Sequence, residues 1–139
     1  MNEPVKNLAM GYYYSPESPY GWHENAFAHL FRGGPAGGGF STVGDMLRFA
    51  RALRGGKLVS ASSLKALWTD RPPNDYGEGF EVTQTAAGKV VGHSGVFGGI
   101  SSRLNIYLDK GCVVIALSNI DNGAPSLTEA IADEIAYAR

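Results

Sequence analysis

The strongest constraint on the fold is a pair of apolar segments joined by a short turn. Between residues 100 and 108, Leu104, Ile106 and Leu108 alternate with polar or aromatic residues, as in a strand with one buried face and one partly covered face. Residues 112–118 begin CVVIAL, an uninterrupted apolar run that favours a central strand covered on both faces. The Asp-Lys-Gly sequence at 109–111 between them is typical of a turn. These two segments predict an antiparallel hairpin, and residues 79–85 and 89–94 predict two further strands.

Helical patterns lie on both sides of these strands. Ser41 or Thr42, with Asp45 as a capping partner, predicts a helix over about residues 42–53. A shorter helix is predicted over 61–68, and a terminal helix over 127–138 behind a Ser126–Glu129 capping box. The predicted architecture is α+β: an antiparallel sheet of about four strands, with a C-terminal helix on one face and a helical, loop-rich segment before the sheet.

The first forty residues have a different character. They contain eight of the aromatic side chains, which follow neither a helical nor a strand period and are interrupted by prolines. We therefore expect an ordered loop over residues 1–40, followed by a helical segment over 41–75 and the sheet with its terminal helix over 76–139. With 139 residues in all, these segments are expected to form a single domain.

Composition narrows the possible functions. Twelve basic and thirteen acidic residues leave a net charge of −1 with no basic cluster, so we expect no nucleic-acid partner. No apolar segment approaches the roughly 18 residues of a membrane span, and residues 1–14 lack the pattern of a signal peptide, which leaves the compartment open. The single cysteine, Cys112, excludes an internal disulfide and a multi-thiolate zinc site.

One predicted strand runs into an unusually glycine-rich sequence, GHSGVFGG at residues 92–99. Glycines there would let a ligand or another chain lie directly against the backbone. At this point the sequence resembles the serine β-lactamase and penicillin-binding-protein family, in its branch of class C β-lactamases, DD-peptidases and esterases. The resemblance rests on motifs in the family's order: LAMGY at 8–12, PAGG at 35–38, ST at 41–42 followed by Asp45, Met46 and Phe49, YGEGF at 76–80, HSG at 93–95 and LSN at 117–119.

The resemblance implies a partial β-lactamase/transpeptidase-like fold and assigns roles to four residues. His93 would take the place of the family's cationic or hydrogen-bonding residue, and Ser94 would orient the substrate's carboxylate or carbonyl. Gly95 would allow close approach of the substrate, and the backbone amide of Val96 would be one of two oxyanion-hole donors. Taken alone, His93 is more often a structural histidine, and Ser94 does not fit a Gly-x-Ser-x-Gly elbow because Val96 occupies the last position.

The family's nucleophile motif, Ser-x-x-Lys, and its Tyr-x-Asn motif are expected upstream of this sequence. A literal Ser-x-x-Lys occurs at residues 62–65, but it lies where the family has a short surface helix, and no tyrosine is followed two residues later by asparagine. We therefore expect the C-terminal portion of a serine hydrolase acting on β-lactams, D-amino-acid peptides or esters, inactive alone and needing no cofactor or metal.

Two alternatives stay open: half of a split enzyme completed by another chain, and a non-catalytic binding or structural domain. The expected partners are a small acyl substrate, once the site is completed, and the missing N-terminal half. Self-association is also expected, because the absence of upstream strands would leave apolar surface and a strand edge uncovered.

Overall fold

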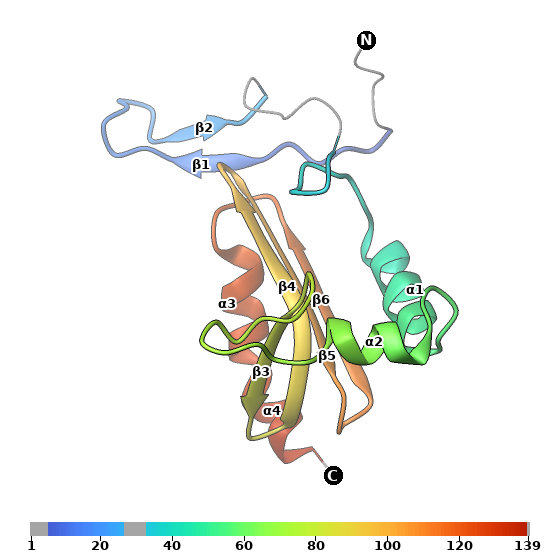
Figure 1. Ribbon diagram of the computed structural model, residues 1–139. Helices are drawn as coiled ribbons and strands as arrows, with labels where there is room; N and C mark the ends of the chain where they lie inside the picture. Colours follow the sequence, from blue (N-terminus) through green and yellow to red (C-terminus); the bar gives the residue numbers. More distant parts are fainter. Residues whose placement is uncertain (1–5, 27–32, 139) are drawn as a thin grey trace.

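The computed structural model describes residues 6–26 and 33–138 of the chain. Its centre is a four-stranded antiparallel sheet in the order β3-β4-β5-β6. The strands are β3 (Glu81–Thr85), β4 (Gly88–Phe97), β5 (Ile100–Tyr107) and β6 (Cys112–Ser118). Helices α1 (Val43–Arg54) and α2 (Ala61–Leu67) lie on one side of this sheet, and α3 (Gly123–Ala130) and α4 (Ala132–Tyr137) lie on the other (Figure 1). The predicted α+β class is confirmed.

Alternation along the strands produces two apolar layers. Val91 and Ile106 are fully buried and pack with Ala50 of α1 in the larger cluster. Val90 and Tyr107 point to the opposite face and form a second cluster with residues of α4. Because neighbouring residues of a strand point to opposite faces, one short stretch of β4 and β5 builds both layers.

Helix α1 begins as the sequence predicts. Thr42 is extended, its hydroxyl accepts a hydrogen bond from the amide of Asp45 at 3.1 Å, and the Asp45 carboxylate accepts one from that hydroxyl at 2.8 Å. The hydrogen bond from Thr42 and the ion pair with Arg48 hold the pKa of Asp45 below its usual value. Ser60 caps α2 in the same way through the amide of Ser63.

The predicted start of the C-terminal helix is wrong. The helix begins at Gly123, behind Asn122, which has a left-handed backbone with φ of 58°. Ser126 lies inside α3, where its amide donates to the carbonyl of Asn122, so the Ser126–Glu129 pattern is not a cap. Pro125 is compatible with this start because the amides of a first helical turn have no partner within the helix. The structure also divides the predicted single helix at Ile131 into α3 and α4.

The apolar run from residue 112 does not form a central strand. Strand β6 pairs with β5 alone among the described strands and lies at the edge of the sheet. Helices α1 and α3 both contact it, so its two faces are covered, although no described strand pairs along its outer edge. An apolar run indicates that both faces of a strand are covered, but it does not indicate where the strand lies in the order of the sheet.

The aromatic N-terminal region contains a short hairpin where we expected a loop. Strands β1 (Tyr12–Tyr14) and β2 (Trp22–Glu24) pair through stacked Tyr13 and His23 and through Tyr14 and Trp22. Three-residue strands are too short to show a period. The hairpin crosses one end of the main sheet (Figure 1), where the buried side chain of Asn25 accepts from the amide of Gly11 and donates to the carbonyl of Gly98.

Within residues 6–26 and 33–138, no helix has both the length and the apolar character needed to cross a bilayer.

Candidate functional site

The four residues singled out in the sequence lie on the second half of β4, beyond the reach of β3. The last pair between these strands joins Glu81 to Gly92. On its other side β4 stays paired with β5 as far as Phe97 and Ile100. From His93 onward, β4 therefore has a strand neighbour on one side and an open edge on the other.

The backbone amide of Val96 faces this open edge. The amide of Ser94 donates to the Glu81 carboxylate at 3.0 Å, so it points toward the side of β3. Backbone groups on a strand alternate between its two neighbours, so the amide of Val96, two residues later, points to the same side. Strand β3 has already ended there, and Val96 is 58% exposed. Among the described residues, no strand pairs with the Val96 amide on that side.

The Ser94 side chain is held by the ion pair between Glu81 and Arg103. Its hydroxyl donates to Oε1 of Glu81 at 2.7 Å, and Oε2 of the same carboxylate pairs with Arg103 at 2.6 Å. Burial opposes ionisation of Glu81, but the two hydrogen bonds from Ser94 and the nearby Arg103 and His93 together hold its pKa below the usual value. The Ser94 proton is committed to this carboxylate, so the hydroxyl oxygen is available chiefly as an acceptor.

His93 is oriented by two hydrogen bonds. Its Nδ1 lies 2.5 Å from the carbonyl oxygen of Ser94, and its Nε2 lies 2.9 Å from the hydroxyl of Tyr76. Because a carbonyl oxygen can only accept, Nδ1 carries a proton in this arrangement, and in the neutral ring Nε2 then accepts from Tyr76. The Tyr76 and His93 rings meet edge to face at 5.7 Å.

His93 and Ser94 do not point to the same face. His93 lies opposite Leu104, whose side chain belongs to the layer under α1, whereas Ser94 lies opposite Arg103. Gly95 follows as an exposed residue, and a Cβ added there would come within 2.9 Å of the Ser102 hydroxyl. The motif therefore presents the histidine ring on one face, the serine hydroxyl on the other and backbone along the edge between them.

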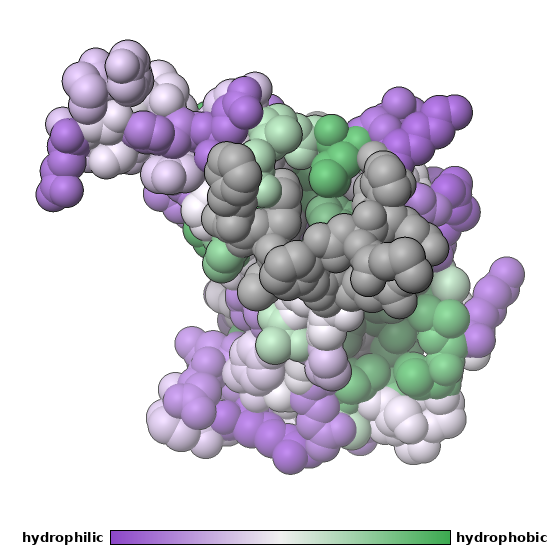
Figure 2. Space-filling model, turned by 90° about the horizontal axis from the view of Figure 1, so that it is seen from above, coloured by the Kyte–Doolittle hydropathy of each residue, from purple (hydrophilic) through white to green (hydrophobic). Residues whose placement is uncertain are grey.

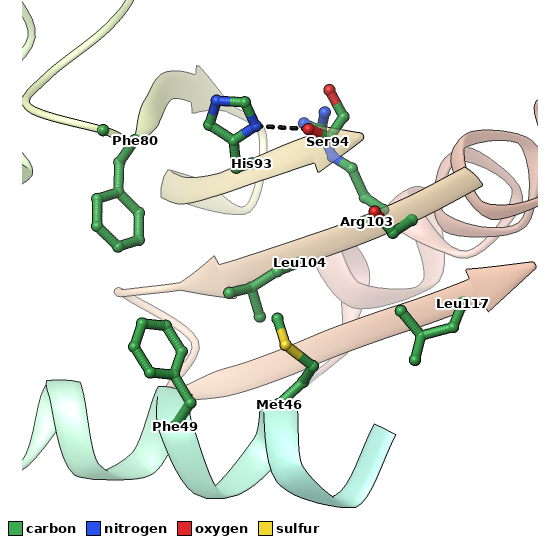
Figure 3. Close-up of a pocket in the computed structure, with 10 residues that line it drawn as sticks. Met46, Phe49, Phe80, His93, Ser94, Arg103, Leu104 and Leu117 are labelled. Carbon is green, nitrogen blue, oxygen red and sulfur yellow. Dashed lines mark hydrogen bonds between the residues drawn. The ribbon is translucent and has the colours of Figure 1, made fainter. Parts of the chain in front are cut away.

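A cavity of about 370 Å³ opens beside this strand. Met46 and Phe49 point into it from α1 toward Leu104, and His93 and Phe80 lie on the side of β4 (Figure 3). The remaining lining residues are Gly79, Ser94, Ser102, Arg103 and Leu117. Its walls are largely apolar with a polar rim at β4, which is typical of a site that binds an organic ligand or an apolar segment of protein.

The literal Ser-x-x-Lys lies elsewhere. Ser62 and Lys65 are exposed on α2, and neither lines the cavity. The Ser62 hydroxyl is 2.9 Å from that of Ser60, the residue that caps the helix. This geometry is that of a surface helix.

Sequence reasoning assigned no role to Tyr76 or Glu81. Tyr76 belongs to the YGEGF motif, but nothing in that motif indicates contact with a residue 17 positions later. For metals, no group of three or more potential ligand side chains occurs in the described part of the chain. His23 stacks on Tyr13.

Comparison with known proteins identifies the family. A family model described as Beta-lactamase matches residues 2–138. The crystal structure of a penicillin binding protein from Bacillus halodurans superimposes with a TM-score of 0.82 at 23% identity, over 95% of this chain and 41% of that one. None of the curated proteins compared with the sequence matches it significantly. The chain thus spans less than half the length of the penicillin binding protein whose fold it shares. The family match covers nearly all of the sequence and confirms the resemblance seen in its motifs: the chain belongs to the β-lactamase family.

Proposed function

We propose that this chain is the C-terminal portion of a β-lactamase-like serine hydrolase and forms the oxyanion side of its acyl-transfer site. In this proposal the His93-Ser94-Gly95 strand lines the substrate, and the nucleophile comes from residues outside this sequence. One observation carries most of the weight: the Val96 amide faces the strand edge beyond the end of β3, two residues after Ser94, which lines the cavity together with His93.

The chemistry follows from that amide. When a serine hydroxyl attacks the carbonyl of a β-lactam, peptide or ester, its oxygen bonds to the carbonyl carbon and its proton passes to a base. The carbonyl oxygen then carries the negative charge. A backbone N–H fixed in advance near that oxygen stabilises the charge without reorganising, and removal of one such donor typically costs about 10²–10³ in rate.

The side chains would orient the substrate. The Ser94 oxygen, held by Glu81, would accept a hydrogen bond from the substrate or from a neighbouring donor. The His93 ring, held by Tyr76 and by the carbonyl of Ser94, would line the substrate from the other face. Among the described residues that line the cavity, the Ser94 hydroxyl is committed to Glu81 and the Ser102 hydroxyl donates to the carbonyl of Gly95, and Ser62 lies on a surface helix.

The first test is hydrolysis by the chain alone. With nitrocefin or p-nitrophenyl acetate we expect no turnover above that of buffer. Turnover that survived Ser62→Ala but fell on His93→Ala would show that the chain contains its own nucleophile, against the proposal.

The second test supplies the missing motifs. A second chain of the family that carries Ser-x-x-Lys and Tyr-x-Asn is mixed with this chain or fused before it, and turnover should appear only in the combination. His93→Ala should reduce that turnover strongly, whereas the matched variant His23→Ala, on the N-terminal hairpin, should leave it nearly unchanged. Binding of a β-lactam near His93 without turnover in any combination would favour a binding domain instead.

A further inference from the structure

A second cavity, of about 210 Å³, lies on the face of the sheet away from α1 and α2. Residues of β3, β4 and β5 form its floor, and residues of α3 and α4 form one wall (Figure 1). Side chains with polar groups predominate among the lining residues. Arg103 lines this cavity and also the candidate site, so the two cavities are neighbours.

The side-chain amide of Asn105 has an unused donor in this cavity. Asn105 is only 8% exposed, and its Oδ1 accepts a hydrogen bond from Nε of Arg103 at 2.8 Å. Because an arginine nitrogen can only donate, this bond fixes the orientation of the amide, with its oxygen toward Arg103 and its Nδ2 turned away. No described residue accepts a hydrogen bond from Nδ2. Since buried polar groups normally have partners, these N–H groups are suited to an acceptor oxygen of a bound molecule.

The charges that line the cavity favour an uncharged acceptor. The Arg103 guanidinium is already paired with the Glu81 carboxylate at 2.6 Å. The pKa of Glu81 lies below its usual value, so both groups are ionised near neutral pH and balance each other. Glu129 of α3 adds an exposed carboxylate to the lining. With one positive and two negative groups around it, a bound carboxylate or phosphate would be repelled.

The α3 side of the cavity offers acceptors. The Thr128 hydroxyl donates to the carbonyl of Pro125 at 2.9 Å, so its oxygen can still accept. The carboxylate of Glu129 accepts as well. The floor at Asn105 therefore offers donors and the wall at α3 offers acceptors. A trans amide group directs its C=O and N–H in opposite directions and carries no net charge, so it matches both sides.

The polar lining distinguishes this cavity from surfaces that further protein covers. Val43 and Phe49 of α1 leave large apolar area exposed on the other side of the sheet, and Figure 2 shows apolar surface gathered on the side of the molecule where α1 lies. Surface of that kind is typical of contacts between proteins. The cavity next to α3 has instead the space of about seven water molecules, at roughly 30 Å³ each, which is the size of a small molecule.

We propose that this cavity binds a small uncharged amide, whose carbonyl oxygen accepts from Nδ2 of Asn105 and whose N–H group donates to Thr128 or Glu129. This site goes beyond the proposed function and does not depend on it. The ligand lies between the sheet and α3, and the acyl substrate lies in the cavity that His93 lines.

Two probes of equal size test the ligand class. N-acetylglycinamide is uncharged, whereas N-acetylglycine has nearly the same shape and a carboxylate at neutral pH. In NMR titrations of the isotope-labelled chain, N-acetylglycinamide should shift the side-chain NH₂ signal of Asn105 and the Nε signal of Arg103 until they saturate. N-acetylglycine should bind at least about tenfold more weakly, because two carboxylates line the cavity. Equal affinity for the two probes, or no shift of these signals, would overturn the proposal.

Two pairs of matched variants test the residues. Asn105→Asp keeps the size of the side chain and the acceptor for Arg103 but removes the donor, so the affinity for N-acetylglycinamide should fall at least about tenfold. Asn74→Asp makes the same change at an exposed position outside the cavity and should bind like the wild type. Glu129→Gln should narrow the difference between the two probes, whereas Glu134→Gln, exposed on α4 outside the cavity, should not.

The exposed position of Glu129 keeps the test valid even if Asn105→Asp does not fold. Wild-type affinity in a folded Asn105→Asp, or an unchanged difference between the probes in Glu129→Gln, would contradict the proposed contacts.

A last titration tests whether the cavity stays open next to an upstream chain. In the fusion that carries Ser-x-x-Lys and Tyr-x-Asn, N-acetylglycinamide should shift the same two signals with the same affinity. Loss of these shifts in the fusion would show that an upstream segment fills the cavity, and the inference would fail. Because the shifts do not depend on turnover, failure of this site and failure of the proposed hydrolase function give different results.

Discussion

Substitution of Glu81 by glutamine tests whether one carboxylate holds the open half of β4 in place. Glu81 accepts hydrogen bonds from the hydroxyl and amide of Ser94 and pairs with Arg103. Hydrogen bonds to a charged group contribute about 1.5–3 kcal/mol, roughly twice the value of neutral ones. Glutamine retains one acceptor oxygen but loses the charge, and the Glu81 and Arg103 side chains are only 27% and 25% exposed. We therefore expect the free energy of unfolding to fall by about 2 kcal/mol.

A second arginine–glutamate pair in the same chain provides the control. Arg71 and Glu78 also form an ion pair, but their side chains are 60% and 50% exposed. Exposed pairs contribute little, so Glu78→Gln should cost no more than about 0.5 kcal/mol. The assay is urea unfolding of the three proteins at one protein concentration and pH 7, followed by circular dichroism. Equal losses in the two variants would refute the reasoning.

The pH dependence gives an independent check on the same residue. In the folded protein the pKa of Glu81 lies below its ordinary value of 4.5, so the unfolded chain takes up a proton more readily. The stabilisation is therefore complete above pH 4.5 and is lost as the pH falls through the lower, folded-state pKa. The difference between wild type and Glu81→Gln should shrink in this acid range. A difference that stayed constant into strong acid would show that the charge is not its cause.

Three further changes have distinct expected results. Ile106→Ala, at a fully buried position, should lower the free energy of unfolding by about 2–5 kcal/mol. Ile100→Ala, at the exposed end of the same strand, should lower it by far less. Similar losses for the two variants in urea titrations would contradict this expectation. Gly99→Ala should loosen the N-terminal hairpin and speed its proteolysis, because φ is +81° and a Cβ would lie 2.8 Å from the amide of Tyr12. Gly98→Ala has open space and should be cut at the wild-type rate. Thr42→Ala should cost about 1 kcal/mol in thermal or urea unfolding through loss of the α1 cap, and no loss would show that the cap is dispensable.

The elements that could be predicted from the sequence are those with a local signal. The Thr42 cap and the alternation of Leu104 and Ile106 depend on residues within a few positions of each other, and both appear where expected. The C-terminal helix shows the limit of such signals. The Ser126–Glu129 spacing occurs inside helices as well as at their starts, and the decisive feature, the left-handed backbone of Asn122, has no strong pattern.

The partners of the candidate site could not be predicted, because they depend on register and loop path. Glu81 reaches Ser94 across 13 positions because β3 pairs with β4 up to Gly92 and no further. Tyr76 reaches His93 across 17 positions from a loop whose path is set by other contacts. The motif HSG identified the strand, but alternation then separates the His93 ring from the Ser94 hydroxyl on opposite faces. A sequence motif therefore predicts which strand segment lies at the site better than it predicts the directions in which the side chains of that segment point.

The discrepancy at β6 has a physical meaning of its own. A strand that is apolar at every position needs cover on both faces, and helices α1 and α3 supply it. Helices that cover the faces of a strand do not pair with the N–H and C=O groups along its edge. Those groups pair with the backbone of another strand, which needs no particular side chain. A sequence adapted to an edge exposed to water would carry a charge or a proline, and residues 112–118 carry neither. The lack of both departs from that pattern, and among the described residues β5 is the only strand that pairs with β6.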